Sequence, residues 1–143
     1  MNGDFEVWNN VDTAPNNWNL GGAGGGECSR EELILKNGLS SVKISHLTGD
    51  FVALYQDISN TSYIANKTFK FECWVYSSDR DSVYLTVSDG NIWYTSKTNS
   101  NINKWEKLQL EFAPSGTNLI RLHIWVINNA DVIADEADLK LNL

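Results

Sequence analysis

Hydrophobic and polar residues alternate with a period of two along most of this 143-residue chain, and turn-forming residues separate the alternating segments. The predicted strands span residues 2–8, 41–47, 51–59, 68–77, 82–89, 91–97, 104–113, 118–127 and 137–143. A succession of short strands joined by turns such as SDRD, SDGN and PSGTN is typical of an antiparallel β-sandwich or barrel. Because no linker interrupts the pattern, residues 1–143 are predicted to form a single domain.

Two segments depart from this alternation. Residues 29–38, SREELILKNG, have the capping-box residues and terminal glycine of a helix, but Leu33 and Leu35 also alternate. The all-β context favours a strand there. Residues 16–27, NNWNLGGAGGGE, are predicted to be a glycine-rich loop, and no GK[ST] motif follows that would indicate phosphate binding.

The phase of the alternation divides the strand residues between core and outer positions. The residues expected to face the core are Phe69, Phe71, Cys73, Val75, Val83, Leu85, Val87, Ile120, Leu122, Ile124 and Val126. The residues left outside include an unusual number of aromatic and hydrogen-bonding side chains, namely Tyr55, Glu72, Trp74, Tyr76, Tyr84, Arg121, His123 and Trp125. The outer face of a sheet more commonly carries Thr, Lys, Ser and Glu.

Two interpretations of these outer residues stay open. Aromatic rings stack on the apolar C–H face of a sugar, and planar polar side chains hydrogen-bond to its hydroxyl groups, so together they suit a carbohydrate ligand. Alternatively, the glycine-rich segment folds over these residues and makes them a second small core. The phase of the strands favours neither interpretation over the other.

The overall charge limits the classes of ligand. There are 18 acidic and 11 basic residues, which give a net charge of −7, so nucleic acids and anionic membranes are not expected partners. No apolar run is long enough for a membrane span, and no signal peptide is visible. Cys28 and Cys73 lack metal-site spacing, and the sequence does not decide whether they pair. No catalytic motif is present, so no enzymatic activity and no catalytic residues are predicted.

The two ends of the chain are acidic. Asp4 and Glu6 lie in NGDFEVW, with Phe5 and Val7 expected to face the core, and Asp135 lies in the closing VIADEADLKL. First and last strands are often neighbours in a sandwich, so these carboxylates would lie close together. Such a group is either a solvated acidic patch or part of a calcium site, since calcium takes carboxylate and carbonyl oxygens.

Seven short motifs occur in a defined order along the chain: NGDFE, Trp18, KNGLSSVKI, ALYQDIS, NKTFKFECWVY, NKWEKLQLEF and VIADEADLKL. In this order and spacing the chain resembles the carbohydrate-binding modules of the four, nine, sixteen and twenty-two group. The resemblance implies a jelly-roll β-sandwich with one structural calcium. The calcium ligands that it implies are Asp4 (through its backbone oxygen), Glu6, Asn37, Ser40 and Asp135.

The resemblance also implies a function. The chain is expected to be a non-catalytic module that binds a polysaccharide or oligosaccharide on a concave sheet. Trp74, Tyr76, Tyr84 and Trp125 are expected to stack on the sugar, while Tyr55, Glu72, Arg121 and His123 are expected to hydrogen-bond to it. We expect a monomeric domain appended to a larger extracellular enzyme or surface protein. The alternative is a structural, protein-interaction or receptor-recognition sandwich of an extracellular or phage protein.

Overall fold

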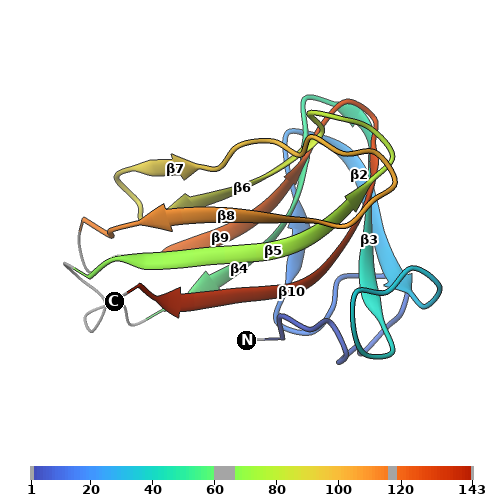
Figure 1. Ribbon diagram of the computed structural model, residues 1–143, viewed down its shortest axis with the longest axis horizontal. Helices are drawn as coiled ribbons and strands as arrows, with labels where there is room; N and C mark the ends of the chain where they lie inside the picture. Colours follow the sequence, from blue (N-terminus) through green and yellow to red (C-terminus); the bar gives the residue numbers. More distant parts are fainter. Residues whose placement is uncertain (1, 60–66, 116–118, 143) are drawn as a thin grey trace.

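Two five-stranded antiparallel sheets pack face to face in the computed structural model, which describes residues 2–59, 67–115 and 119–142 (Figure 1). Sheet I has the strand order β1 (Asn19–Gly21), β4 (Val52–Ile58), β9 (Ile120–Val126), β6 (Val83–Ser88) and β7 (Trp93–Thr95). Sheet II has the order β2 (Gly24–Glu31), β3 (Ser41–Gly49), β10 (Asp131–Leu141), β5 (Phe69–Ser77) and β8 (Glu106–Phe112). The predicted all-β, jelly-roll sandwich is confirmed.

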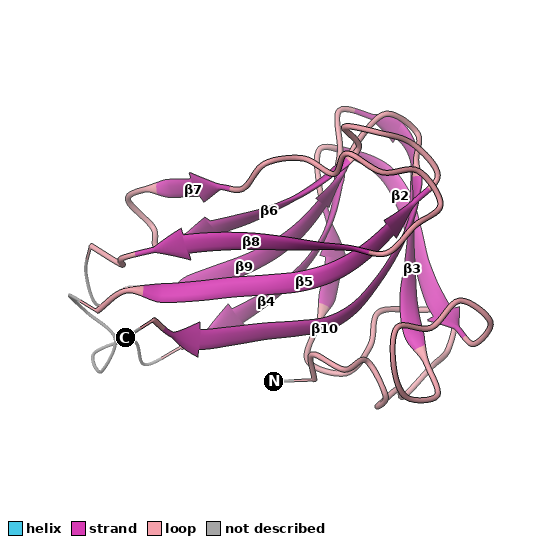
Figure 2. Ribbon diagram, in the orientation of Figure 1, coloured by secondary structure: helices cyan, strands magenta, loops and turns pink. Residues whose placement is uncertain are grey.

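Only strands and loops occur among the described residues (Figure 2), and accordingly no helix there is long and apolar enough to cross a membrane. From residue 41 onward, each predicted strand has a counterpart among the described residues, with differences at some boundaries. For example, β10 begins at Asp131, earlier than the predicted start at residue 137. Residues 118 and 143, where two predicted strands begin or end, lie outside the described residues.

The core lies between the two sheets and is built from the residues that the phase placed inward. All of the predicted inward residues of β5, β6 and β9 are buried, and Leu85, Leu122 and Ile124 are 0% exposed. Burying a side chain of this size contributes about 1.5–3 kcal/mol. Cys28 and Cys73 are both buried and free, so each serves as a small apolar residue.

The N-terminal segment is not the predicted strand. Turns at its start and a φ of 53° at Phe5 interrupt the alternation. Phe5 is buried against Trp18, with ring centroids 5.5 Å apart, whereas Val7 is 55% exposed instead of facing the core. The segment still adjoins the last strand, because the Ala137 amide donates to the Gly3 carbonyl at 2.7 Å.

The two ambiguous segments also differ from expectation. β2 ends at Glu31, and residues 32–40 form an irregular loop in which the Glu31 carboxylate accepts the Leu33 amide at 2.7 Å. The glycine-rich segment supplies β1 and the first residues of β2 and is not a loop throughout. Glycine is needed for this pairing at residue 24, where an added Cβ would lie 2.1 Å from the Thr48 carbonyl oxygen.

Candidate functional site

The eight residues predicted to share one binding face lie on the outer faces of two different sheets. Sheet I carries Tyr55, Tyr84, Arg121, His123 and Trp125. Sheet II carries Glu72, Trp74 and Tyr76, all on β5. The single shared face was wrong because β5 pairs with β10 and β8, whereas β9 pairs with β4 and β6. Whether any of these residues binds a ligand stays a prediction.

The outer face of sheet I is organised around Trp125. Its ring stacks on Phe51 at a centroid distance of 3.7 Å and on Tyr84, its cross-strand neighbour on β6, at 5.8 Å. A third ring, Trp93 from β7, meets it edge-on at 6.1 Å. Stacked and edge-to-face aromatic pairs stabilise beyond their buried area, so each ring of the cluster helps to hold its neighbours in place.

Trp93 is the most exposed aromatic residue of this cluster and was not among the predicted ligands. It stacks on His123 at 5.3 Å, yet 59% of it is exposed to solvent. On β7 it alternates with Tyr94, which packs against the core and donates its hydroxyl to the Ala113 carbonyl. The alternation of residues 91–97 is therefore sufficient to predict that Trp93 points outward.

An arginine borders the aromatic cluster in a fixed orientation. Arg121 donates two hydrogen bonds to the Asp57 carboxylate, at 2.6 and 2.8 Å, and its guanidinium carbon lies 4.3 Å from the Tyr55 ring centroid. The hydrogen bonds from Arg121 lower the pKa of Asp57. This pair is partly exposed, so it orients Arg121 more than it stabilises the fold. A pocket of about 220 Å³ opens beside it, lined by Ser88, Gly90, Trp93, Leu119 and Arg121.

The glycine-rich segment does not cover this face in the described part of the chain. Its residues pair at the edge of sheet I instead, with Gly21 opposite Ala53. An added Cβ at Gly21 would lie 3.0 Å from the Tyr55 ring, so glycine lets β1 lie close to that side chain. The structure thus favours an accessible aromatic face over a second small core.

His123 lies among these rings and is 5% exposed. Burial, followed by the positive charge of Arg121, lowers its pKa to about 4, so the imidazole is neutral at pH 7. In the unfolded chain His123 has its ordinary pKa of about 6.5, so on acidification it is protonated in the unfolded state before it is protonated in the folded state. The free energy of unfolding should therefore fall by about 3 kcal/mol as the pH drops from about 6.5 to about 4.

Urea denaturation of the wild type and of His123→Gln across that pH range would measure this contribution. Since the other titrating groups are shared, we expect the wild type to lose more stability than the variant. Equal losses in the two proteins would show that His123 does not titrate as its surroundings imply.

On sheet II, the three predicted residues are tied into local contacts. Tyr76 packs edge-on against Trp105 at 5.6 Å. Trp74 lies beneath the Lys36 ammonium, which is 4.2 Å from its ring centroid. Glu72 is 3% exposed and accepts a hydrogen bond from Lys140 at 2.7 Å. This set lies on the opposite side of the sandwich from the Trp93–Trp125 cluster.

The sequence of residues 1–130 matches the family model described as carbohydrate binding domain, CBM_4_9. The chain belongs to this family of carbohydrate-binding modules. The resemblance drawn from the sequence is thereby confirmed. A sequence search of curated proteins found no match.

Solved structures of carbohydrate-binding modules share the fold. TmCBM61, solved in complex with β-1,4-galactotriose, is 15% identical with a TM-score of 0.72, and the match covers 99% of this chain and 97% of that one. The CBM22-1 xylan-binding domain of Paenibacillus barcinonensis Xyn10C is 19% identical, with a TM-score of 0.67 and coverages of 92% and 89%. The CBM22-1–GH10 modules of Clostridium thermocellum xylanase 10B, complexed with xylohexaose, are 14% identical with a TM-score of 0.71, covering 87% of this chain and 26% of that one.

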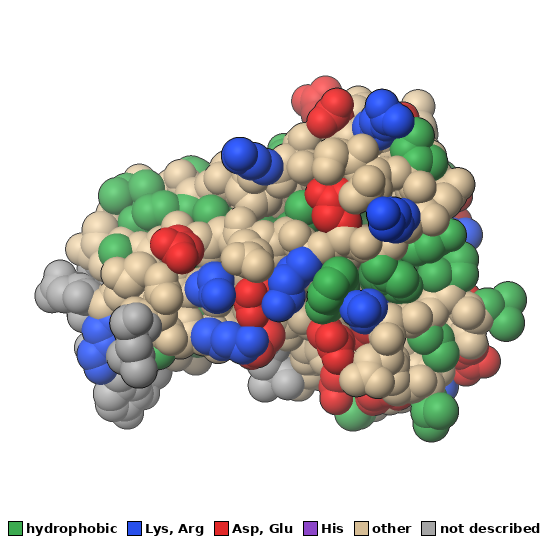
Figure 3. Space-filling view, viewed as in Figure 1, with side chains coloured by type: hydrophobic (Ala, Val, Ile, Leu, Met, Phe, Trp, Pro, Cys, Tyr) green, Lys and Arg blue, Asp and Glu red, His purple; other side chains and the backbone are tan. Residues whose placement is uncertain are grey.

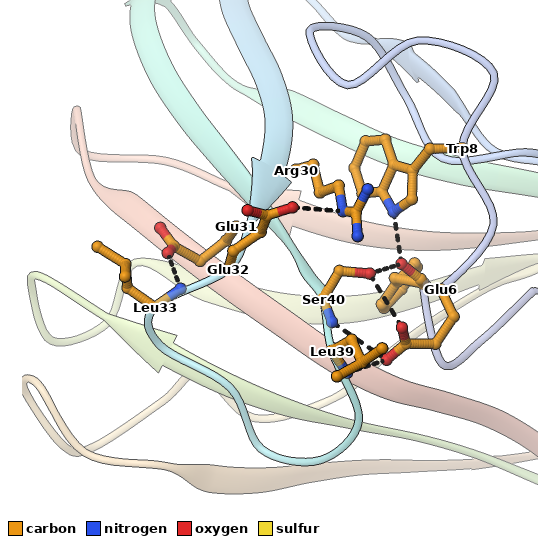
Figure 4. A network of polar contacts seen from close by, with 9 residues as sticks. Glu6, Trp8, Arg30, Glu31, Glu32, Leu33, Leu39 and Ser40 are labelled. Carbon is orange, nitrogen blue, oxygen red and sulfur yellow. Dashed lines mark hydrogen bonds and ion pairs between the residues drawn. The ribbon is translucent and has the colours of Figure 1, made fainter.

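The residues implied as calcium ligands in this carbohydrate-binding module lie close together, between the N-terminal segment, the loop of residues 32–40 and β10. Asp4, Glu6, Asn37 and Asp135 line a common pocket of about 320 Å³, together with Gly38, Leu39 and Glu136. Ser40 adjoins it, donating its hydroxyl to the Phe5 carbonyl at 2.8 Å and to Glu6 at 3.3 Å. The Glu6 carboxylate also accepts the amides of Leu39 and Ser40 (Figure 4).

Asp135 is the buried member of this group, at 1% exposed. Its carboxylate accepts the amides of Lys36, Asn37 and Glu136 at 3.2, 3.1 and 2.8 Å. Burial nevertheless raises its pKa to about 6, because those amides only partly replace water.

The donor set of this pocket suits a hard cation that accepts mixed oxygen ligands. No basic side chain lines it, while four carboxylate residues do, namely Asp4, Glu6, Asp135 and Glu136. Within the described residues, however, no three or more His, Cys, Asp or Glu side chains converge closely enough to hold a metal. Carbonyl, amide or hydroxyl oxygens would have to complete the coordination, as calcium allows.

Proposed function

We propose that this module binds an oligosaccharide or polysaccharide without catalysis, on the outer face of sheet I. The observation that carries the proposal is the exposed Trp93 ring, supported from behind by His123 and edge-on by Trp125. A pyranose ring would stack on the free face of Trp93. Because the supporting rings hold the indole in place, little side-chain entropy is lost on binding.

In this proposal, hydrogen bonds at the border of the aromatic cluster orient the bound sugar. Arg121 uses two N–H groups on Asp57, which leaves its other donors for sugar hydroxyl groups. The same ion pair lowers the pKa of Asp57, so this carboxyl group is not set up to act as a general acid. Family membership agrees with this role.

A binding module of this kind acts by raising the local concentration of whatever it is attached to. We propose that the chain is part of a larger extracellular enzyme or surface protein and holds it near a polysaccharide. The xylanase 10B modules, in which a module of this fold is joined to a GH10 module, support that arrangement.

We propose a structural role for calcium at the pocket between the N-terminal segment and β10. Glu6, Asn37, Ser40, Asp135 and the Asp4 backbone oxygen would hold it. Calcium would neutralise the buried Asp135 carboxylate. It would also link the N-terminal segment to β10, the last strand. The pocket is remote from Trp93 in this account, so calcium would stabilise the module without touching the sugar.

Calorimetric titration with oligosaccharides of xylan, β-glucan, mannan and β-1,4-galactan tests the binding proposal. We expect weak, reversible binding of at least one of them. Absence of binding across the panel would overturn the proposal and favour a structural or protein-interaction sandwich.

Arg121→Lys is expected to weaken binding of the oligosaccharide found in that panel by about 1.4 kcal/mol, roughly tenfold. Lysine keeps the charge but lacks the planar fork that pairs with Asp57 and stacks on Tyr55. The melting temperature should change little, because Arg121 is partly exposed. Titration calorimetry measures the affinity, and an unchanged affinity would remove Arg121 from the binding surface.

A further inference from the structure

A second cluster of aromatic and charged side chains lies on the outer face of sheet II. Figure 3 shows this face, with basic side chains gathered next to acidic ones over β5 and β10. The cluster comprises Trp74 and Glu72 on β5 with four lysines: Lys36, Lys70, Lys107 and Lys140. These are four of the 11 basic residues of the chain, and they lie beside the carboxylates of Glu72 and Asp138.

Three of the lysines share one carboxylate. Glu72 accepts a hydrogen bond from Lys140 at 2.7 Å, and its other oxygen lies 3.6 Å from Lys70 and 3.5 Å from Lys107. Lys140 also pairs with Asp138 at 3.2 Å. Asp138 can neutralise Lys140. Glu72 then neutralises either Lys70 or Lys107, and the positive charge of the other lysine is left without a partner in this group.

Lys36 adds a further positive charge over the Trp74 ring. Its ammonium lies 4.2 Å from the ring centroid, and the Lys107 ammonium lies 5.7 Å from it. Lys36 has no carboxylate within ion-pair distance among the ion pairs of the described residues. A cation–π contact at an exposed position is weak, so a ligand can displace this ammonium from the ring at little cost.

A hollow in the surface adjoins these groups. Its volume is about 430 Å³, within the range of small-ligand sites, and its lining includes Trp74, Glu72, Lys107 and Lys140. Asp4, Glu136 and Asp138 also line it, and Asp138 pairs with Lys140. Lys36 and Lys107 are the two lysines near the Trp74 ring, so a ligand with one anionic group is expected to direct that group toward them.

We propose that this hollow is a second saccharide site, which takes a carboxylate-bearing sugar such as a hexuronic acid unit. The sugar ring stacks on Trp74, its carboxylate pairs with Lys36 and Lys107, and its hydroxyl groups meet the carboxylates of Asp4, Glu136 and Asp138. The site lies on the opposite sheet from Trp93, so the two sites bind independently.

Titration of the purified module with three acidic probes tests this site: oligogalacturonate, oligomannuronate and a glucuronic-acid-bearing xylo-oligosaccharide. For at least one probe we expect binding that weakens with added salt and falls at least tenfold when its carboxylates are methyl-esterified. Trp74→Ala and the double variant Lys36→Gln/Lys107→Gln should each lose at least tenfold. Trp93→Ala is the matched control and should retain this binding.

Three results would overturn the proposal: no binding of any acidic probe, equal binding of the methyl ester, or loss of binding in Trp93→Ala with retention in Trp74→Ala. A melting curve of each variant verifies that it folds. Binding of neutral oligosaccharides is measured separately, with Trp93→Ala as the test variant. A negative result at the sheet II site therefore leaves the sheet I proposal standing, and a negative result at the sheet I site leaves the sheet II proposal standing.

Discussion

Trp93→Ala is expected to weaken binding of neutral oligosaccharides by about 2 kcal/mol, roughly thirtyfold, while leaving the fold intact. The indole is 59% exposed, so its removal forfeits the stacking platform but little buried area. Its contacts with His123 and Trp125 limit the loss of stability to about 1 kcal/mol. Titration calorimetry measures the affinity, and a thermal melt measures the stability.

Two controls sharpen this prediction. Trp125→Ala should lower both affinity and stability, the latter by about 2–4 kcal/mol, because its ring is stacked between Phe51 and Tyr84. Trp74→Ala removes an indole from the opposite sheet and should leave neutral-sugar affinity unchanged. If Trp93→Ala bound as tightly as the wild type while Trp74→Ala did not, the assignment of the primary site to sheet I would be wrong.

Calcium is expected to raise the melting temperature of the module by about 8 °C at a free concentration about 100 times its dissociation constant. Binding at that ratio stabilises the folded state by about 2.7 kcal/mol. For a chain of 143 residues, 1 kcal/mol corresponds to about 3 °C. Differential scanning calorimetry in calcium and in chelator measures the shift.

Asp135→Asn should abolish the calcium response, because it neutralises the buried carboxylate of the pocket. Asp138→Asn is the matched control on the same strand, where the carboxylate pairs with Lys140, and should keep the response. Sugar affinity should be the same with and without calcium as long as the protein is folded. Identical melting curves in calcium and in chelator would rule out the proposed cation site.

Local alternation was enough to predict the core but not the assignment of outer residues to faces. Leu85, Leu122 and Ile124 were placed correctly because strand phase depends only on neighbouring residues. Trp74 and Trp125 have the same outward phase, yet they lie on opposite sides of the molecule. Which strands share a sheet depends on long-range pairing, which the alternation does not encode.

Backbone conformation explains the remaining differences from the sequence predictions. The positive φ at Phe5 cannot be inferred from NGDFEVW, and it exposes Val7 while keeping Phe5 buried. A bulge in β10 interrupts its register with β5 between Asp135 and Asp138, so alternation along VIADEADLKL did not give the direction of those carboxylates. The proximity of Asp4, Glu6 and Asp135 was nevertheless expected, because the first and last segments of a sandwich are often neighbours, and the N-terminal segment does adjoin β10.

The most direct test of the central claim is an NMR titration of the module with a neutral oligosaccharide that it binds, observing the six indole N–H resonances. Binding on the outer face of sheet I predicts shifts of the Trp93 and Trp125 resonances, with Trp74 and Trp105 on the opposite side unaffected. Shifts confined to Trp74 and Trp105, with Trp93 and Trp125 unchanged, would contradict it.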